Sequence, residues 1–159
     1  MEPRLCFIRE SYFLLHPEFE KMLDPGKPEK QSKRTHLCLE LSIGNNQYYI
    51  PLRNNLGEPV RKYGRIGHKV SSQERPNAGL DYRYTLIINE EEYIEEQKEL
   101  RIPRSQYKVL KNDIEVIKRE FYVYLKGYIK ALKKGRQFKE PLFRESSLIN
   151  FQEILLGQK

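Results

Sequence analysis

Residues 37–52, LCLELSIGNNQYYIPL, predict a β-hairpin. From His36 to Ser42, leucines alternate with polar or small side chains, which is the period of a half-buried strand. Gly44, Asn45 and Asn46 follow as a turn signal, because Gly and Asn adopt positive φ at little cost. Residues 47–52 are rich in aromatic and β-branched side chains and form the returning strand. Pro51 indicates that this strand ends there or lies at a sheet edge.

The segments on either side of the hairpin predict an α+β domain. Apolar residues recur at steps of three and four over 105–134, which predicts one long amphipathic helix that Gly135 ends as a C-terminal cap. Strands followed by such a helix indicate an antiparallel sheet packed against it. The remaining expected elements are a strand at 5–8, a helix or turn at 11–23, loops at 24–33 and 53–77, a strand at 84–88 and a short helix at 146–156.

Length and composition favour a single domain over residues 1–159. Cys6 and Cys38 lie in apolar runs and are expected to be buried free thiols. The histidines at positions 16, 36 and 68 are scattered, so we expect neither a metal site nor a cofactor. No signal peptide and no run of about 20 apolar residues is present, so a cytoplasmic protein is expected.

The net charge of +7 favours an anionic partner, either nucleic acid or a membrane surface. Basic residues concentrate in 53–69 and 101–139, and an acidic block at 90–99 separates them. A solvated face explains one charged run, whereas two basic segments around an acidic one suggest a positive surface. Phosphate binding is therefore the favoured interpretation.

Candidate phosphate ligands stand at both ends of the predicted hairpin. Lys33 and Arg34 enter it, and Arg53 and Asn54 leave it. If the two strands pair across the Gly44 turn, these residues return to the same end of the sheet. Guanidinium groups suit bidentate contacts with phosphate. The alternative is that these are ordinary hairpin-end charges.

The loop after the hairpin supplies a second group of candidates. It carries Lys62, Arg65, His68 and Lys69, and His68 is a possible acid or base near neutral pH. A lone loop histidine can equally be only exposed. Basic residues at the end of the long helix (Lys133, Lys134 and Arg136) are further candidates for RNA binding, and Tyr12, Tyr48, Tyr49 and Tyr82 are candidates for stacking on unpaired bases.

The sequence contains no Gly-rich phosphate loop, nucleophile elbow or cluster of metal ligands. If the chain cleaves RNA, the ribose 2′-hydroxyl must therefore be the nucleophile. The protein then supplies a proton acceptor, a proton donor and positive charge around the phosphorane, for which Arg, Lys, Tyr, His and backbone amides are suitable.

The stretch from Leu37 to Leu52 resembles the signature of the ToxN/AbiQ family, the toxins of type III toxin–antitoxin systems. The early Ser11-Tyr12, the basic residue before the hairpin and the long closing helix fit the same family. Pro51-Leu52-Arg53-Asn54-Asn55, Gly79-Leu80-Asp81-Tyr82 and Ile87-Ile88 look closest to its TenpN branch.

The resemblance implies a compact barrel-type fold like that of MazF and Kid, with a twisted antiparallel sheet and flanking helices. It implies a metal-independent endoribonuclease that cuts a structured antitoxin RNA from a repeat precursor, stays bound to it and closes into a ring of several toxin–RNA units. By position, Tyr12 matches an active-site tyrosine and Arg34 the basic residue at the hairpin entrance. Arg53 and Asn54 stand where ToxN has a threonine–serine pair, which is a departure from the family pattern.

The sequence thus predicts a sequence-specific endoribonuclease toxin of a phage-defence system that leaves 2′,3′-cyclic phosphate ends. Arg34 and Arg53 would hold the scissile phosphate, Asn54 would orient it, and Tyr12 or His68 would assist proton transfer. The expected partners are antitoxin RNA and cellular or phage mRNA, and neither DNA nor a membrane. A non-catalytic RNA-binding module is the leading alternative; a toxin of the same fold that inhibits a protein target is another.

Overall fold

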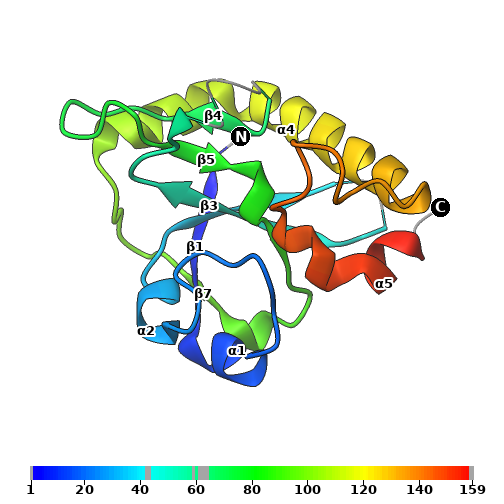
Figure 1. The fold of residues 1–159 in the computed structure, drawn as a ribbon. Helices are drawn as coiled ribbons and strands as arrows, with labels where there is room; N and C mark the ends of the chain where they lie inside the picture. Colours follow the sequence, from blue (N-terminus) through cyan, green and yellow to red (C-terminus); the bar gives the residue numbers. More distant parts are fainter. Residues whose placement is uncertain (1, 42–43, 59, 61–64, 158–159) are drawn as a thin grey trace.

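The computed structural model describes residues 2–41, 44–58, 60 and 65–157 (Figure 1). Its strands form a seven-stranded sheet in the order β4-β5-β3-β2-β1-β7, with β6 also pairing with β3, and all recorded pairings are antiparallel. The predicted α+β class and antiparallel sheet are confirmed. The strands are β1 (Arg4–Ile8), β2 (His36–Glu40), β3 (Gln47–Arg53), β4 (Gly67–Lys69), β5 (Gly79–Asp81), β6 (Leu86–Ile87) and β7 (Ile94–Glu96).

Helical segments flank this sheet. Figure 1 shows the long α4 running along one side of the sheet, with α1 and α2 gathered at the opposite end of the molecule. The helices are α1 (Glu10–Leu15), α2 (Pro28–Gln31), η1 (Tyr82–Tyr84), η2 (Glu91–Tyr93), α4 (Arg104–Lys133), η3 (Ser147–Phe151) and α5 (Gln152–Leu156).

The predicted hairpin is present as β2 and β3. Leu37 lies opposite Ile50 and Leu39 opposite Tyr48. Gly44 and Asn45 form the turn with φ of 67° and 54°, as their residue types predicted. Pairing continues past the end of β2, because the Leu52 amide donates to the Thr35 carbonyl at 2.9 Å. The hairpin therefore ends with Arg34 and Arg53 at the same end of the sheet.

Both faces of the hairpin are buried, which corrects the prediction of a half-buried strand. On one face, the Tyr48 ring packs on Phe121 of α4, with ring centroids 5.3 Å apart. On the other face, His36 and Cys38 are only 4% and 6% exposed. Met22 and the segment around it cover that second face, so polar residue types there do not mean solvent contact.

The long helix forms where its apolar periodicity predicted. Leu110, Ile114 and Ile117 are buried along its inner face. It ends in a Schellman motif: Gly135 has φ of +67°, its amide donates to the Leu132 carbonyl, and the Arg136 amide donates to the Ala131 carbonyl. Gly135 is thus the C-terminal cap that the sequence predicted.

Several short elements lie in segments where no strand or helix was predicted. β4 lies within the predicted loop 53–77, α2 within the loop 24–33, and β7 within the acidic block. β4 and β7 have three residues each, too few to show a hydrophobic period. They are the two ends of the sheet, and they do not pair with each other in the described residues. The sheet is open, so the barrel-type closure that the resemblance implied is wrong.

Aromatic residues fill much of the core. Tyr12, Tyr48, Tyr49 and Tyr82 are at most 4% exposed, so the prediction that they are free to stack on bases is wrong. Cys6 and Cys38 are buried and unpaired, as expected. Within the described residues, no helix is both long enough and apolar enough to span a bilayer.

Close contact between backbones predicts that Gly79→Ala destabilises the fold. A Cβ at Gly79 would lie 2.3 Å from the His68 carbonyl oxygen and 2.5 Å from Leu56 Cδ1. Separating β4 from β5 to relieve this overlap should cost at least about 2 kcal/mol of unfolding free energy in chemical denaturation. Gly157→Ala, whose Cβ would make only ordinary contacts, should change it by less than about 0.5 kcal/mol. Equal effects of the two substitutions would contradict the close β4–β5 packing.

Candidate functional site

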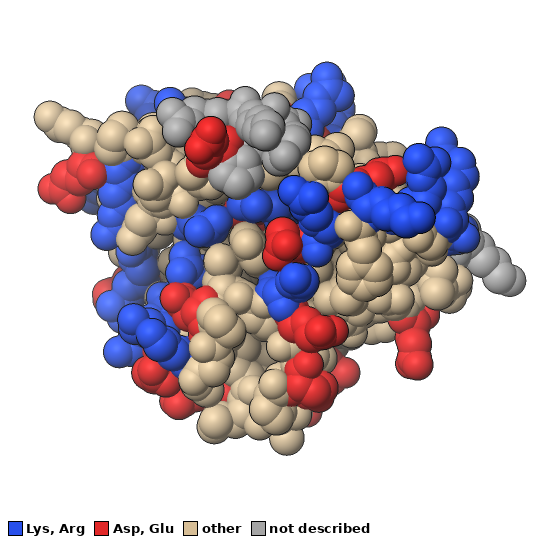
Figure 2. All heavy atoms as spheres, in the orientation of Figure 1, with Lys and Arg blue, Asp and Glu red and all other residues tan. Residues whose placement is uncertain are grey.

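A cleft of about 390 Å³ lies at the open end of the β2–β3 hairpin. Segments far apart in the sequence meet there: the chain around α2, the ends of β2 and β3, the loop between β4 and β5, and the residues before α4. In Figure 2, Lys and Arg side chains follow the left margin of the molecule beside α2, where these segments lie. The lining residues are Asp24, Lys30, Lys33, Arg34, Thr35, Leu52, Asn54, Arg75, Arg101 and Ile102.

Cationic side chains dominate this cleft. Lys30, Lys33, Arg75 and Arg101 are exposed, and none of them forms an ion pair with a carboxylate in the described part of the chain. Their charges are therefore available to a ligand. Several unpaired cations around one concavity make a binding site for a polyanion such as a nucleic-acid backbone.

Arg34 is the cation that is held most firmly. One guanidinium nitrogen donates to Asp24 Oδ2 at 2.9 Å, and the other terminal nitrogen donates to the Leu52 carbonyl at 3.3 Å. The Arg34 side chain is 23% exposed, so it faces the cleft while it is supported from behind. A guanidinium fixed in this way loses little entropy when it binds an anion.

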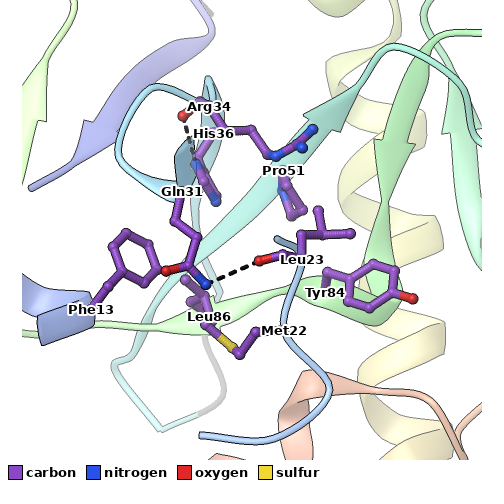
Figure 3. Close-up of a pocket in the computed structure, with 9 residues that line it drawn as sticks. All are labelled: Phe13, Met22, Leu23, Gln31, Arg34, His36, Pro51, Tyr84 and Leu86. Carbon is purple, nitrogen blue, oxygen red and sulfur yellow. Dashed lines mark hydrogen bonds between the residues drawn. The ribbon is translucent and has the colours of Figure 1, made fainter. Parts of the chain in front are cut away.

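Side chains that line a small pocket behind the Arg34–Asp24 ion pair hold the backbone at or next to both residues (Figure 3). The Gln31 side chain donates from Nε2 to the carbonyl of Leu23, the residue before Asp24, at 3.0 Å. His36 Nδ1 donates to the Arg34 carbonyl at 3.0 Å. The pocket has a volume of about 20 Å³, enough for one water and too small for a nucleobase. It therefore supports the cleft and does not extend it.

Arg53 lies outside the cleft lining. Its guanidinium donates to Asp81 at 2.8 Å and stacks over the Tyr84 ring at 5.4 Å. Asp81 is fully buried and also accepts two bonds from the Arg83 side chain. A buried carboxylate needs such partners, so Arg53 has a structural function here whether or not it also contacts RNA. Its proposed phosphate contact stays a prediction.

Tyr12 is likewise not a cleft residue in this structure. It is 4% exposed and packs among Phe13, His16, Phe19 and Tyr93, with ring centroids 4.8–6.0 Å apart. Burial raises the pKa of its hydroxyl well above the usual value, and nearby carboxylates add to this effect. A phenol in this environment is a poor proton acceptor at neutral pH.

His68 bridges the sheet to α4. Its Nδ1 lies 2.7 Å from Glu120 Oε1 and its Nε2 lies 2.9 Å from Asp113 Oδ2. The Tyr82 hydroxyl donates to the same Glu120 oxygen at 2.8 Å. Each ring nitrogen thus has a carboxylate oxygen as its partner, and His68 is engaged on both sides. The structure does not bring His68 into the cleft.

The other predicted RNA-binding residues lie apart from the cleft. Arg65 and Lys69 are exposed near β4, and Lys62 lies outside the described residues. Lys133, Lys134 and Arg136 are exposed at the C-terminal end of α4, where Figure 2 shows a second group of basic side chains at the right. Of the twelve predicted site residues, the cleft unites Lys33, Arg34 and Asn54.

Sequence reasoning missed several cleft residues. Lys30 comes from α2, Arg75 from the β4–β5 loop and Arg101 from the segment before α4, and no local pattern links them. Asp24 was overlooked because it stands in a Pro/Gly-containing loop. A signal was available for Asp24, because aspartate in a Pro/Gly-containing loop tolerates left-handed backbone angles.

No protein-family model and no curated protein matches the sequence. The fold is similar to that of a solved structure from a study of bacterial type III toxin–antitoxin systems, described as selective toxin inhibition by a non-coding RNA pseudoknot. The TM-score is 0.58 with 16% sequence identity over 78% of each chain. The chain has a ToxN-like fold. In this ToxN-like fold, the basic cleft lies at the open end of the β2–β3 hairpin, where the chain enters β2 and leaves β3.

Acid should destabilise the protein through His36. Burial lowers the pKa of this imidazole from 6.5 to about 4, and the Arg34 charge adds to the shift. Because the unfolded chain takes up the proton first, the stabilisation is complete above pH 6.5 and is lost as the pH falls from 6.5 to 4. The loss amounts to about 3 kcal/mol of unfolding free energy. His36→Gln keeps a donor for the Arg34 carbonyl but does not titrate, so its stability should depend less on pH across this range. Identical pH dependence in both proteins would contradict a neutral, buried His36.

Proposed function

We propose that the chain is a metal-independent, sequence-specific endoribonuclease toxin of a type III toxin–antitoxin system, of the TenpN branch of the ToxN/AbiQ family. One observation carries the proposal: a cleft lined by five cations at the end of the central hairpin of a ToxN-like fold. The whole chain acts as a single toxin domain in phage defence.

The cleft supplies what cleavage by the ribose 2′-hydroxyl requires. Arg34, held by Asp24 and Leu52, binds the scissile phosphate and stabilises the charge that develops on the phosphorane. Lys33 and Asn54 lie on either side of the hairpin end and contact the same phosphate. The 2′-oxygen displaces the 5′-oxygen, and the products are a 2′,3′-cyclic phosphate and a 5′-hydroxyl.

Other basic side chains bind RNA outside the reacting centre. Arg75 and Arg101 extend the cleft and contact flanking phosphates. Arg65 and Lys69 near β4 and the group at the end of α4 offer further phosphate contacts to a structured RNA that is larger than the cleft. We propose that the antitoxin RNA, cut from its repeat precursor, bridges several toxin units into a closed ring, and that cellular or phage mRNA is the substrate of the free toxin.

Purified protein should cut a long unstructured RNA at discrete positions in EDTA, and Arg34→Ala should remove most of this activity. Loss of a preorganised charge at the reacting phosphate costs about 10²–10³-fold in rate. Arg144→Ala removes the same charge from an exposed position outside the cleft lining and should cut normally. Thermal unfolding of each variant separates a loss of activity from a loss of fold. Tight RNA binding without cuts would instead support a non-catalytic RNA-binding module.

Salt should weaken RNA binding less steeply in the Arg75→Ala/Arg101→Ala double variant. Each phosphate contact to single-stranded RNA contributes about 0.7 to the slope of log K against log salt, so the slope should fall by about 1.4. Stability should hardly change, because neither guanidinium has an ion-pair partner in the described residues. Filter-binding measurements of RNA affinity between about 50 and 300 mM salt give the slope. An unchanged slope would show that the RNA phosphates contact neither Arg75 nor Arg101.

A further inference from the structure

The proposed reaction lacks a proton acceptor in the residues that the sequence suggested. Tyr12 is buried in an aromatic cluster, and His68 is bonded to carboxylates on both sides. Attack by a 2′-hydroxyl needs a group that takes its proton, within about 3 Å of the oxygen. That group must line the cleft beside Arg34.

Asp24 meets this requirement. It is the one carboxylate among the described residues that line the cleft. Its Oδ2 accepts from Arg34 at 2.9 Å, whereas Oδ1 has no hydrogen-bond partner in the described part of the chain. The side chain is 29% exposed, so a substrate can reach it. One oxygen thus holds the phosphate-binding cation, and the other is left for the substrate.

The backbone at Asp24 is adapted to this placement. Its φ is +48°, in the left-handed region that only Gly, Asn and Asp adopt at little cost. The Leu23 carbonyl before it is tied to the buried Gln31, and the Asp24 carbonyl itself accepts from the Lys27 amide at 3.1 Å. These two backbone hydrogen bonds and the bond from Arg34 therefore fix where the carboxylate points. Unusual backbone angles held by their surroundings are common at functional sites.

The cations around Asp24 attract a phosphate toward it. Arg34 faces it from the entrance of β2, Lys30 and Lys33 from α2 and the residues after it, Arg75 from the β4–β5 loop, and Arg101 from the segment before α4. The cations draw the substrate phosphate to within reach of the carboxylate. A phosphate bound to Arg34 would lie beside Asp24, which accepts a hydrogen bond from the same guanidinium.

We propose that Asp24 is the general base of the cleavage reaction, an inference that rests on the endoribonuclease function proposed above. Asp24 Oδ1 takes the proton of the 2′-hydroxyl as the 2′-oxygen forms its bond to phosphorus. The bond between phosphorus and the 5′-oxygen breaks, and the leaving oxygen takes a proton from water. The protonated carboxyl then returns its proton to solvent, so the protein ends in its starting state.

Asp24→Asn is a close test of this assignment. Asparagine tolerates the left-handed backbone, has the same shape and can still accept a hydrogen bond from Arg34, but it is not a base. The single-turnover rate on an RNA with a mapped cut site should fall at least about 100-fold. Affinity for the same RNA with a 2′-deoxyribose at the cut site should stay equal or increase, because a negative charge leaves a cationic cleft.

A matched charge control is Glu29→Gln, an exposed carboxylate of α2 outside the cleft lining. It should change neither rate nor affinity by more than about twofold. Higher affinity with faster cleavage by Asp24→Asn would show that Asp24 only neutralises Arg34, and would overturn the proposal. A parallel fall in rate and affinity would assign Asp24 a structural role and overturn it as well. A parent protein that cuts no RNA would refute the nuclease function itself and, with it, the role of Asp24.

Discussion

The pairing of β2 with β3 is the constraint on which the rest of the site depends. Because the strands are antiparallel and the register continues to the bond between Leu52 and Thr35, the chain enters and leaves the hairpin at one point. Arg34 and Asn54 are brought to the same cleft by this register alone. A shift of one residue would turn every side chain to the other face of the sheet, and would remove Arg34 from the Leu52 carbonyl that supports it.

Arginine has two kinds of environment in this fold, one buried beside Asp81 and one at the cleft. Arg53 and Arg83 share the buried Asp81 and the Tyr84 ring, so their charges are used within the protein. Among the described residues that line the cleft, Asp24 is the one carboxylate beside five cations, and it pairs with Arg34. The mutual repulsion of these cations lowers the stability of the free protein, and a bound polyanion relieves it. The cleft therefore suits a phosphate ligand, and in the proposed reaction its carboxylate is the proton acceptor.

The sequence predicted the parts of this structure that follow from local periodicity. The hairpin at 37–52 and the helix at 105–134 are confirmed, since alternation and the 3.6-residue period are strong over those lengths. The three-residue strands β4 and β7 left no such pattern. Tyr48 and Tyr82 were candidates for stacking on unpaired bases, yet both are fully buried. Arg34 could be predicted from its place before the hairpin, whereas Arg75 and Arg101 reach the cleft only through tertiary contacts that no local rule describes.

The chemistry of the RNA ends tests the central claim most directly. Mass spectrometry of RNA cut by the purified protein in EDTA identifies the groups on both sides of each cut. Attack by the ribose 2′-hydroxyl predicts a 2′,3′-cyclic phosphate on one fragment and a 5′-hydroxyl on the next. A 3′-hydroxyl beside a 5′-phosphate would mean that water is the nucleophile, and would contradict both the proposed reaction and the function of the cleft in it.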